Sequence, residues 1–330
     1  MWWVLLLVLV SLIVLTVCGN ALVCLAVAIS PKLRCIANGF VVSLAATDLL
    51  LGLLVLPFSA TLELHQDWPL GSALCNVYIS LDIMLCTASI LNLLAISVDR
   101  YLAITAPLKY HTRVTPGRFA AALALIWTVS LTVSFLPIHL GWNTLDFSVQ
   151  NQNLDQAQVA SDRMCRFEWN RSYVLLDSMA TFYLPLLAMC LMYHRIFRIA
   201  RAQARRVGVA SALRDHKATV TLAAILGAFV FCWFPYFTFF LLMGLCEERE
   251  PPKEPYSIVL WLGYTNSALN PLLYAALNRD FRRAYGRLLH CPRALKTPRI
   301  SSLISWQQRS LNEPSGCSIP CDIVTTEEEE

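Results

Sequence analysis

The sequence predicts an all-α membrane protein built as a bundle of seven transmembrane helices. Of its 330 residues 57% are hydrophobic and only 15% are charged, which is too apolar for a soluble chain that needs a charged surface. Seven apolar stretches are each long enough to cross about 30 Å of hydrocarbon, which takes roughly 20 helical residues. An odd number of spans places the two termini on opposite sides of the membrane.

The predicted spans follow one another at short intervals along the chain. The first is apolar over too long a run for a signal peptide and shows no small-residue cleavage site, so we interpret it as a spanning helix. Each later span is an apolar run that carries one or a few polar residues, and these residues indicate its role. The spans are residues 3–29, 37–62, 73–104, 117–140, 172–198, 217–246 and 256–277.

The distribution of basic residues predicts the orientation. If the first, third and fifth loops and the carboxyl end share one side, that side holds 21 of the 26 Lys and Arg residues. Because basic residues are retained in the cytoplasm, the amino terminus is predicted to lie outside and the carboxyl terminus inside. The net charge of +4 is then a signal of topology and does not indicate nucleic-acid binding.

Two of the twelve cysteines differ from the rest. Most lie inside spans as small apolar residues, and the set shows no metal-ligand spacing. Cys75 opens the third span and Cys165 lies in the long outer loop before the fifth, so both face the oxidising exterior. We therefore predict a disulfide that ties this loop across the mouth of the bundle.

The third and fifth spans each carry a carboxylate that lipid should exclude. Asp82 lies seven residues, about 10 Å, below Cys75 on nearly the same face, where it suits the counter-ion of a cationic ligand. Asp177 and Thr181 are four residues apart on one helical face, and they offer an acceptor and a hydroxyl to the far end of a short ligand. The alternative for each acid is a buried carboxyl that neighbours satisfy for packing alone.

Aromatic residues of the sixth and seventh spans are expected to complete this pocket. An aromatic stripe is more often packing or an interface anchor, but this one straddles Pro235, where the missing amide favours a kink. A kinked helix with a bulky Trp beneath the ligand is a plausible lever. The residues are Trp233, Tyr236, Phe237, Phe240, Trp261 and Tyr264.

A second polar cluster is predicted deeper in the membrane around Asp48 of the second span. Polar groups from several helices at this depth suit either a hydrated sodium ion or an interhelical hydrogen-bond network without an ion, and the sequence leaves these two level. The other members are Asn20, Ser89, Asn266, Ser267 and Asn270.

The third span ends in Asp99-Arg100-Tyr101, about 26 Å below Asp82. An Arg at a cytoplasmic helix end is what topology requires in any case. With Asp215 at the start of the sixth helix, however, Arg100 offers an ion pair that holds the inner face shut. Opening that pair would expose an apolar groove for a partner's helix.

Together these residues resemble the rhodopsin-like (class A) G-protein-coupled receptors over residues 1 to about 290. The resemblance is carried, in chain order, by Gly19-Asn20, Leu44-Ala45-Ala46-Thr47-Asp48, Cys75, Asp99-Arg100-Tyr101, Trp127, Pro185, Cys232-Trp233-Phe234-Pro235 and Asn270-Pro271-Leu272-Leu273-Tyr274. The surroundings of Asp82 and of Thr181 are similar to the aminergic branch, and within it to histamine receptors of the second subtype.

This resemblance implies a cell-surface receptor for histamine, with Asp82 taking the ammonium and Asp177 and Thr181 the imidazole. It implies coupling to the stimulatory G protein, a rise in cyclic AMP and arrestin as a further partner. It assigns Pro235, Asn270, Pro271 and Tyr274 to the activation switch. It also implies a short amphipathic eighth helix from Asn278, a palmitoylation site at Cys291, a receptor domain over 1–290 and a disordered cytoplasmic tail over 291–330.

Several other functions find no support in the sequence. A retinal-binding photoreceptor needs a Lys in the seventh span, where the matching position is Tyr264. A transporter or channel predicts repeated halves or a polar pore helix, and an enzyme predicts a phosphate-binding Gly loop or metal-ligand spacing. The remaining alternatives are a receptor for another biogenic amine or a constitutively active receptor without a physiological ligand.

Overall fold

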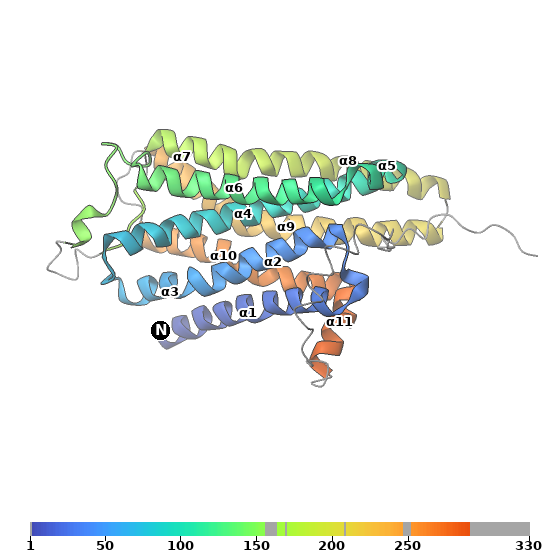
Figure 1. Ribbon diagram of the computed structural model, residues 1–330, viewed down its shortest axis with the longest axis horizontal. Helices are drawn as coiled ribbons and strands as arrows, with labels where there is room; N and C mark the ends of the chain where they lie inside the picture. The colour runs from blue at the N-terminus through green and yellow to red at the C-terminus, as the bar shows by residue number, and fades with distance from the viewer. Residues whose placement is uncertain (1, 156–163, 169, 208, 247–251, 291–330) are drawn as a thin grey trace, which may run out of the picture.

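The computed structural model describes residues 2–155, 164–168, 170–207, 209–246 and 252–290. Long helices run side by side along the long axis of the molecule, and the described chain contains no strand (Figure 1). The bundle consists of α1 (Trp2–Ile29), α2 and α3 (Ile36–Leu54, Leu56–His65), α4 (Gly71–Thr105), α6 (Pro116–His139), α7 with η4 and α8 (Arg171–Asp177, Ser178–Tyr183, Leu184–Val207), α9 (Val209–Cys246) and α10 (Lys253–Leu277).

Seven long helical spans are thus confirmed, and their ends differ from the prediction mainly where the fifth span leads into the sixth. The predicted second span is split between α2 and α3 at Val55, because Pro57 has no amide proton to continue the helical hydrogen bonds. The fifth span continues to Val207 and the sixth already begins at Val209, so both helices extend beyond the apolar stretch. Shorter elements connect them: η1 (Pro31–Leu33), α5 (Pro107–Arg113) and η2 (Gln152–Asp155).

Six of the spans, including α4, pack in a closed ring, and α6 packs against α4 from outside it. Neighbouring pairs are α1 with α2, α2 with α4, α8 with α9, α9 with α10, and α10 with α1, while α4 also packs against α6 and α8. The first and last spans, α1 and α10, therefore meet. Helix α4 contributes buried side chains along most of its length, from Cys75 to Asp99.

The surface of the bundle is largely apolar, and several polar side chains are buried among the apolar ones of the interior. Exposed side chains include Leu7, Leu125 and Phe231, each between 64% and 68% exposed, whereas Asn20, Asp48 and Asn92 are fully buried. Six helical segments are long and apolar enough to cross a membrane. The seventh, α10, is equally long but carries buried polar residues at Asn266, Ser267 and Asn270. A bundle of this kind is built for lipid as its solvent.

The eighth helix expected after the last span is α11 (Arg279–His290). It turns away from the axis of the bundle, as Figure 1 shows. Phe281, Ala284 and Tyr285 are buried against α1 and η1, while Arg282 and Arg283 are exposed on the other face. This amphipathic pattern suits a helix that lies in the membrane interface.

Candidate functional site

The centre of the site is the Asp82 carboxylate on α4, which meets α10 through a hydrogen bond. The Tyr264 hydroxyl donates to Oδ2 of Asp82 at 2.8 Å, and the Cys86 thiol donates to Oδ1 at 3.5 Å. Among the described residues no Lys, Arg or His forms an ion pair with this carboxylate. Asp82 is therefore an oriented acceptor with its charge uncompensated by a basic side chain.

A chain of hydroxyl groups extends from Asp82 toward the outer end of the bundle. Ser59 of α3 lies 2.7 Å from the Tyr78 hydroxyl and 3.4 Å from the Tyr264 hydroxyl. All three residues are buried. Because Tyr264 donates its proton to Asp82, it accepts from Ser59 on this side. Ser59 and Tyr78 were not predicted from the sequence, since a Ser and a Tyr within apolar spans carry no distinctive pattern.

The predicted aromatic residues of α9 do form one continuous wall. The Trp233 ring lies 5.9 Å from both Tyr236 and Phe237, and Tyr236 stacks on Phe240 at 6.1 Å. Phe237 in turn stacks on Phe182 of η4 with ring centroids 4.3 Å apart. This wall joins the sixth and fifth spans beside the carboxylates.

The Trp233 side chain fits against α10 because Gly263 has no side chain there. A Cβ atom on Gly263 would lie 2.9 Å from Cζ3 of Trp233. Its indole nitrogen is buried and donates to no protein atom in the described chain. Helix α9 continues through Pro235, two residues beyond. The bend expected at Pro235 and its role in activation stay predictions.

A lid covers the outer end of the site, and the predicted disulfide is present. Cys75 and Cys165 are bonded, with their Cα atoms 5.6 Å apart. Two residues beyond, Phe167 lies 6.1 Å from the Phe240 ring and 5.9 Å from Tyr173. Phe167 was not predicted from the sequence, although its position two residues after a tethered cysteine is a usable signal.

Amide side chains fix the other described parts of the lid, on either side of residues 156–163. Asn143 donates to Oε1 of Gln150 at 2.6 Å and to the Glu168 carbonyl oxygen at 2.9 Å, while Asn76 of α4 donates to the Gln150 carbonyl oxygen. Partial burial, and then the neighbouring Asp146, raise the pKa of Glu168. The lid is thus held by α4 at several points beside the disulfide.

Asp177 and Thr181 lie where the helix changes from α to π geometry. Asp177 ends α7, and Thr181 belongs to the π-helical turn η4, so the regular α-helix predicted over 172–198 is wrong at this point. The Thr181 hydroxyl donates to the Asp177 carbonyl oxygen at 2.7 Å. Its proton is therefore engaged by the backbone, and the Asp177 carboxylate has no ion-pair partner in the described chain.

The cluster around Asp48 assembles largely as predicted, but with different partners. Ser267 and Asn270 each donate to the carboxylate at 2.8 Å, and Ser89 donates at 3.4 Å. Asn266, which the sequence analysis assigned to a sodium site, leaves its Nδ2 without a hydrogen bond, and Ser267 takes its place. Asn20 instead bridges α1 to α10 by donating to the Ser267 carbonyl oxygen at 2.9 Å.

The inner end of α4 is closed by its own neighbours. Arg100 donates from Nε and Nη2 to Oδ2 of Asp99, at 2.9 and 2.6 Å, and Tyr110 of α5 donates to Oδ1 at 2.7 Å. Burial, and next the hydrogen bond to Asp99, raise the pKa of Tyr110. The Asp215 side chain lies outside the described part of α9, so its pairing with Arg100 stays a prediction. Tyr101 accepts from Arg195 at 3.3 Å.

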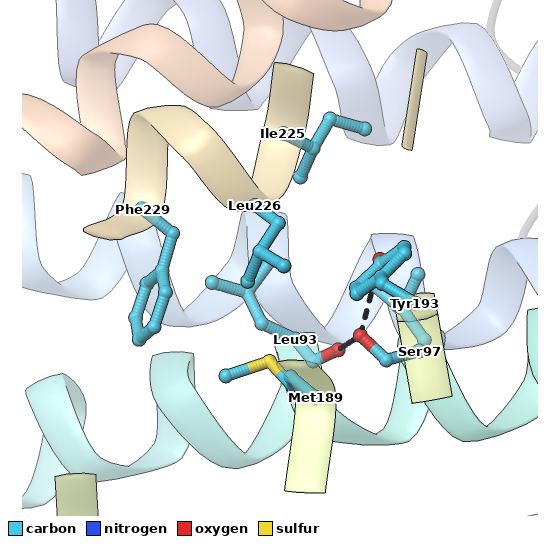
Figure 2. Close-up of a pocket in the computed structure, with 8 residues that line it drawn as sticks. Leu93, Ser97, Met189, Tyr193, Ile225, Leu226 and Phe229 are labelled. Atoms are coloured by element: carbon cyan, nitrogen blue, oxygen red, sulfur yellow. Dashed lines mark hydrogen bonds between the residues drawn. The ribbon is translucent and has the colours of Figure 1, made fainter. Parts of the chain in front are cut away.

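A small cavity of about 10 Å³ lies between α4, α8 and α9, near the Arg100 end of α4 (Figure 2). Ser97 donates to the Leu93 carbonyl oxygen at 2.8 Å and lies 3.2 Å from the Tyr193 hydroxyl. Because Ser97 has only one proton, Tyr193 is the donor in the second bond. Apolar side chains such as Met189 and Phe229 complete the lining.

Pro271 and Tyr274 of α10, which the sequence analysis assigns to an activation switch, are tightly packed. Tyr274 is buried and stacks on Phe281 of α11 at 5.4 Å. Pro271 lies so close to α1 that a Cβ on Gly19 would come within 2.9 Å of its Cγ. Cys291, the predicted lipidation site, lies outside the described residues.

Comparisons with known proteins agree with this architecture. The sequence profile described as "7 transmembrane receptor (rhodopsin family)" matches residues 19–274. The Histamine H2 receptor of Rattus norvegicus is 54% identical over 301 residues, which cover 90% of this chain and 82% of that protein. The Histamine H2 receptor of Homo sapiens is 54% identical over 303 residues with the same shares.

A more distant relative is named for a different amine. The D(1A) dopamine receptor of Didelphis virginiana is 36% identical over 328 residues, which cover 87% of this chain and 73% of that protein. The profile match covers most of the chain, and the bundle has the seven spans that the profile describes. This chain therefore belongs to the rhodopsin family of seven-transmembrane receptors.

Proposed function

We propose that this receptor binds histamine at the cell surface and activates the stimulatory G protein, which raises cyclic AMP. The observation that carries the proposal is the Asp82 carboxylate, held by Tyr264 beneath the Cys75–Cys165 lid without a basic partner among the described residues. An ammonium ion suits such a site, because a charge-assisted hydrogen bond is strong where water is excluded. The 54% identity to Histamine H2 receptors supports histamine as the amine.

The second half of the proposed ligand site is Asp177 with Thr181. Asp177 accepts a hydrogen bond from the N–H group of the imidazole. The Thr181 hydroxyl rotates away from the Asp177 carbonyl oxygen and donates to the other ring nitrogen. Trp233, Tyr236, Phe237 and Phe240 contact the apolar face of the ring. A carboxylate paired with a hydroxyl matches one donor and one acceptor better than a row of hydroxyls does.

The remaining assignments belong to the same proposal. The amino terminus is outside, the receptor domain covers 1–290, and the tail over 291–330 is cytoplasmic with palmitate on Cys291. Asp99, Arg100, Tyr101, Asp215, Pro235, Asn270, Pro271 and Tyr274 make up the activation switch, with the G protein and then arrestin binding at the inner end. The protein signals without being an enzyme.

A sodium ion is compatible with the donor set around Asp48. The cluster presents oxygen ligands, which hard cations prefer: the carboxylate of Asp48 and the hydroxyls of Ser89 and Ser267. To bind the ion, the two hydroxyls would have to turn their protons away from it. Asn270 presents Nδ2 and supports the carboxylate from the other side. When bound, the ion would supply positive charge to a buried acid.

The test is a panel of amines on cells that express the receptor, with cyclic AMP as the readout. Histamine should be more potent than dopamine, adrenaline and serotonin. A receptor for another biogenic amine is the second candidate, because the D(1A) dopamine receptor is a relative at 36% identity. A catecholamine or serotonin as the most potent agonist would favour that candidate, and no response to any amine would contradict both.

A further inference from the structure

A groove of about 410 Å³ lies on the outside of the bundle between α4 and α6, near the Arg100 end. Leu94 and Val98 of α4 form one wall, and Leu125 and Val129 of α6 form the other. Leu125 is 64% exposed and Val98 is 39% exposed. Because these side chains belong to spanning helices, the groove opens to the hydrocarbon of the membrane.

The floor of the groove is fixed by a close approach between α6 and α2. The Phe119 ring packs edge-on against Phe40 with centroids 4.8 Å apart. A Cβ atom on Gly39 would lie 2.4 Å from Cζ of Phe119, so only glycine lets the ring lie this deep. The depression is therefore built into the backbone and does not depend on one flexible side chain.

One end of the groove is positively charged. Arg113 of α5 and Arg118 of α6 line it, and both are exposed. Nη1 of Arg118 donates to the carbonyl oxygens of Arg113 at 3.0 Å and of Thr112 at 3.4 Å, which directs its guanidinium along the rim. Asp99 is the one acid in the lining, and it is 3% exposed and already paired with Arg100 and Tyr110.

We propose that this groove binds one anionic phospholipid, with its phosphate on Arg113 and Arg118 and an acyl chain between α4 and α6. Two guanidinium groups match a phosphate in charge and in hydrogen-bond geometry. In the proposed orientation this rim lies in the cytoplasmic leaflet, where anionic lipids gather. The site is separate from the ligand pocket and does not depend on which amine the receptor binds.

The chemistry of the groove distinguishes this lipid from other occupants. A sterol would fill the apolar walls but offers only a neutral hydroxyl to the two Arg side chains. Free phosphate would meet the Arg side chains and leave the walls in contact with bulk lipid. A phosphatidylcholine headgroup adds a cation beside the rim. Of these four occupants, only an anionic phospholipid satisfies both ends of the groove at once.

The experiment uses the full-length receptor in membranes that contain photoactivatable phosphatidylglycerol or phosphatidylcholine with identical acyl chains, followed by peptide mapping. Phosphatidylglycerol should label the groove faces of α4 and α6, at Val98, Leu125 or Val129, about thirtyfold over phosphatidylcholine, as expected for two basic side chains near the surface. Equal labelling by the two lipids at these positions would overturn the proposal.

Two variants separate the charge from the cavity. Arg113→Gln with Arg118→Gln should abolish the preference, and Ala122→Phe should remove the labelling by filling the groove. The matched control is Arg282→Gln with Arg283→Gln, an exposed basic pair on α11 that lies off the groove and should change nothing. Melting temperatures confirm that each variant is folded, and unchanged labelling in folded Arg113→Gln/Arg118→Gln receptor would contradict the role of the Arg pair.

Competition identifies the source of the ligand. Unlabelled phosphatidylglycerol should displace the probe, whereas cholesterol and glycerol 3-phosphate should not. Displacement by cholesterol would make the groove a sterol site, and displacement by glycerol 3-phosphate would make it a free-phosphate site. Either result would overturn the assignment to an anionic phospholipid.

Discussion

The Tyr264 hydroxyl on α10 is bonded to the Asp82 carboxylate on α4 at 2.8 Å. Tyr264 is fully buried, and Ser59 holds its oxygen from the other side at 3.4 Å. The Asp82 carboxylate is thereby oriented before the proposed ligand arrives, so binding does not include the free-energy cost of ordering this side chain. A preorganised carboxylate increases affinity mainly by reducing such ordering costs.

Removing the charge of Asp82 should affect amine binding most. Asp82→Asn keeps the shape of the side chain, and we expect amine binding to weaken by about 2–5 kcal/mol, as for truncating a buried charge pair. Tyr264→Phe removes only the hydrogen bond, so its effect should be smaller, about 1.5–3 kcal/mol. Competition binding at equal surface expression measures both. Unchanged amine affinity in Asp82→Asn would contradict the counter-ion role.

Asp177 should determine which amine is preferred. Asp177→Ala removes the acceptor for the ring N–H, so histamine potency should fall by about tenfold or more, in the range of a hydrogen bond to a charged group. Ligands that need only Asp82 should keep their potency. The measurement is cyclic AMP over the same amine panel, with Met179→Ala, an exposed neighbour on η4, as the control. Equal losses for all ligands would indicate a general structural role instead.

Gly263 should not tolerate even a methyl group. In Gly263→Ala the new Cβ would stand 2.9 Å from the Trp233 ring, and overpacking of this kind costs about 1–3 kcal/mol. Gly227 of α9 has open space around its Cβ position, so Gly227→Ala serves as the matched control. There the gain in helix propensity should leave the melting temperature equal or higher. Thermal unfolding in detergent compares the two, and equal melting temperatures would refute close packing at Trp233.

The bond between Tyr193 and Ser97 should couple α8 to α4. Tyr193→Phe and Ser97→Ala each remove it, so the double variant should be less destabilised than the sum of the single ones. We expect a coupling of about 0.5–1.5 kcal/mol, the size of one neutral hydrogen bond. A double-mutant cycle from thermal unfolding provides the value. The two hydroxyls lie 3.2 Å apart, and a dashed line joins them in Figure 2. Strict additivity would mean that they do not interact.

Much of this arrangement follows from the sequence because lipid simplifies the problem. A carboxylate within an apolar run is too costly to expose to lipid. Asp48 and Asp82 could therefore be assigned to the interior before their partners were known. The same reasoning holds for Cys75 and Cys165, which share the oxidising side. The spans and the disulfide were predictable from the residues themselves, whereas the eighth helix was predicted from the family resemblance.

Partners on neighbouring helices were harder to predict, because they depend on rotation and depth. Asn266 and Ser267 are adjacent in sequence, yet only Ser267 turns its hydroxyl to Asp48. Ser59 reaches the site through packing that no local pattern records. The π turn also leaves no signal in hydropathy, since the apolar run continues through it.

That π turn, η4, has an evolutionary consequence. A π turn accommodates one more residue than an α turn, and one residue corresponds to about 100° of helix rotation. The segment before the turn carries Asp177, and the segment after it carries Met189 and Tyr193. The two segments belong to one continuous span, but the turn sets the rotation of one relative to the other. Gain or loss of a single residue within η4 would rotate the outer face while leaving the inner one in place. The chemistry that selects a ligand can thus diverge between relatives while the inner surface stays unchanged.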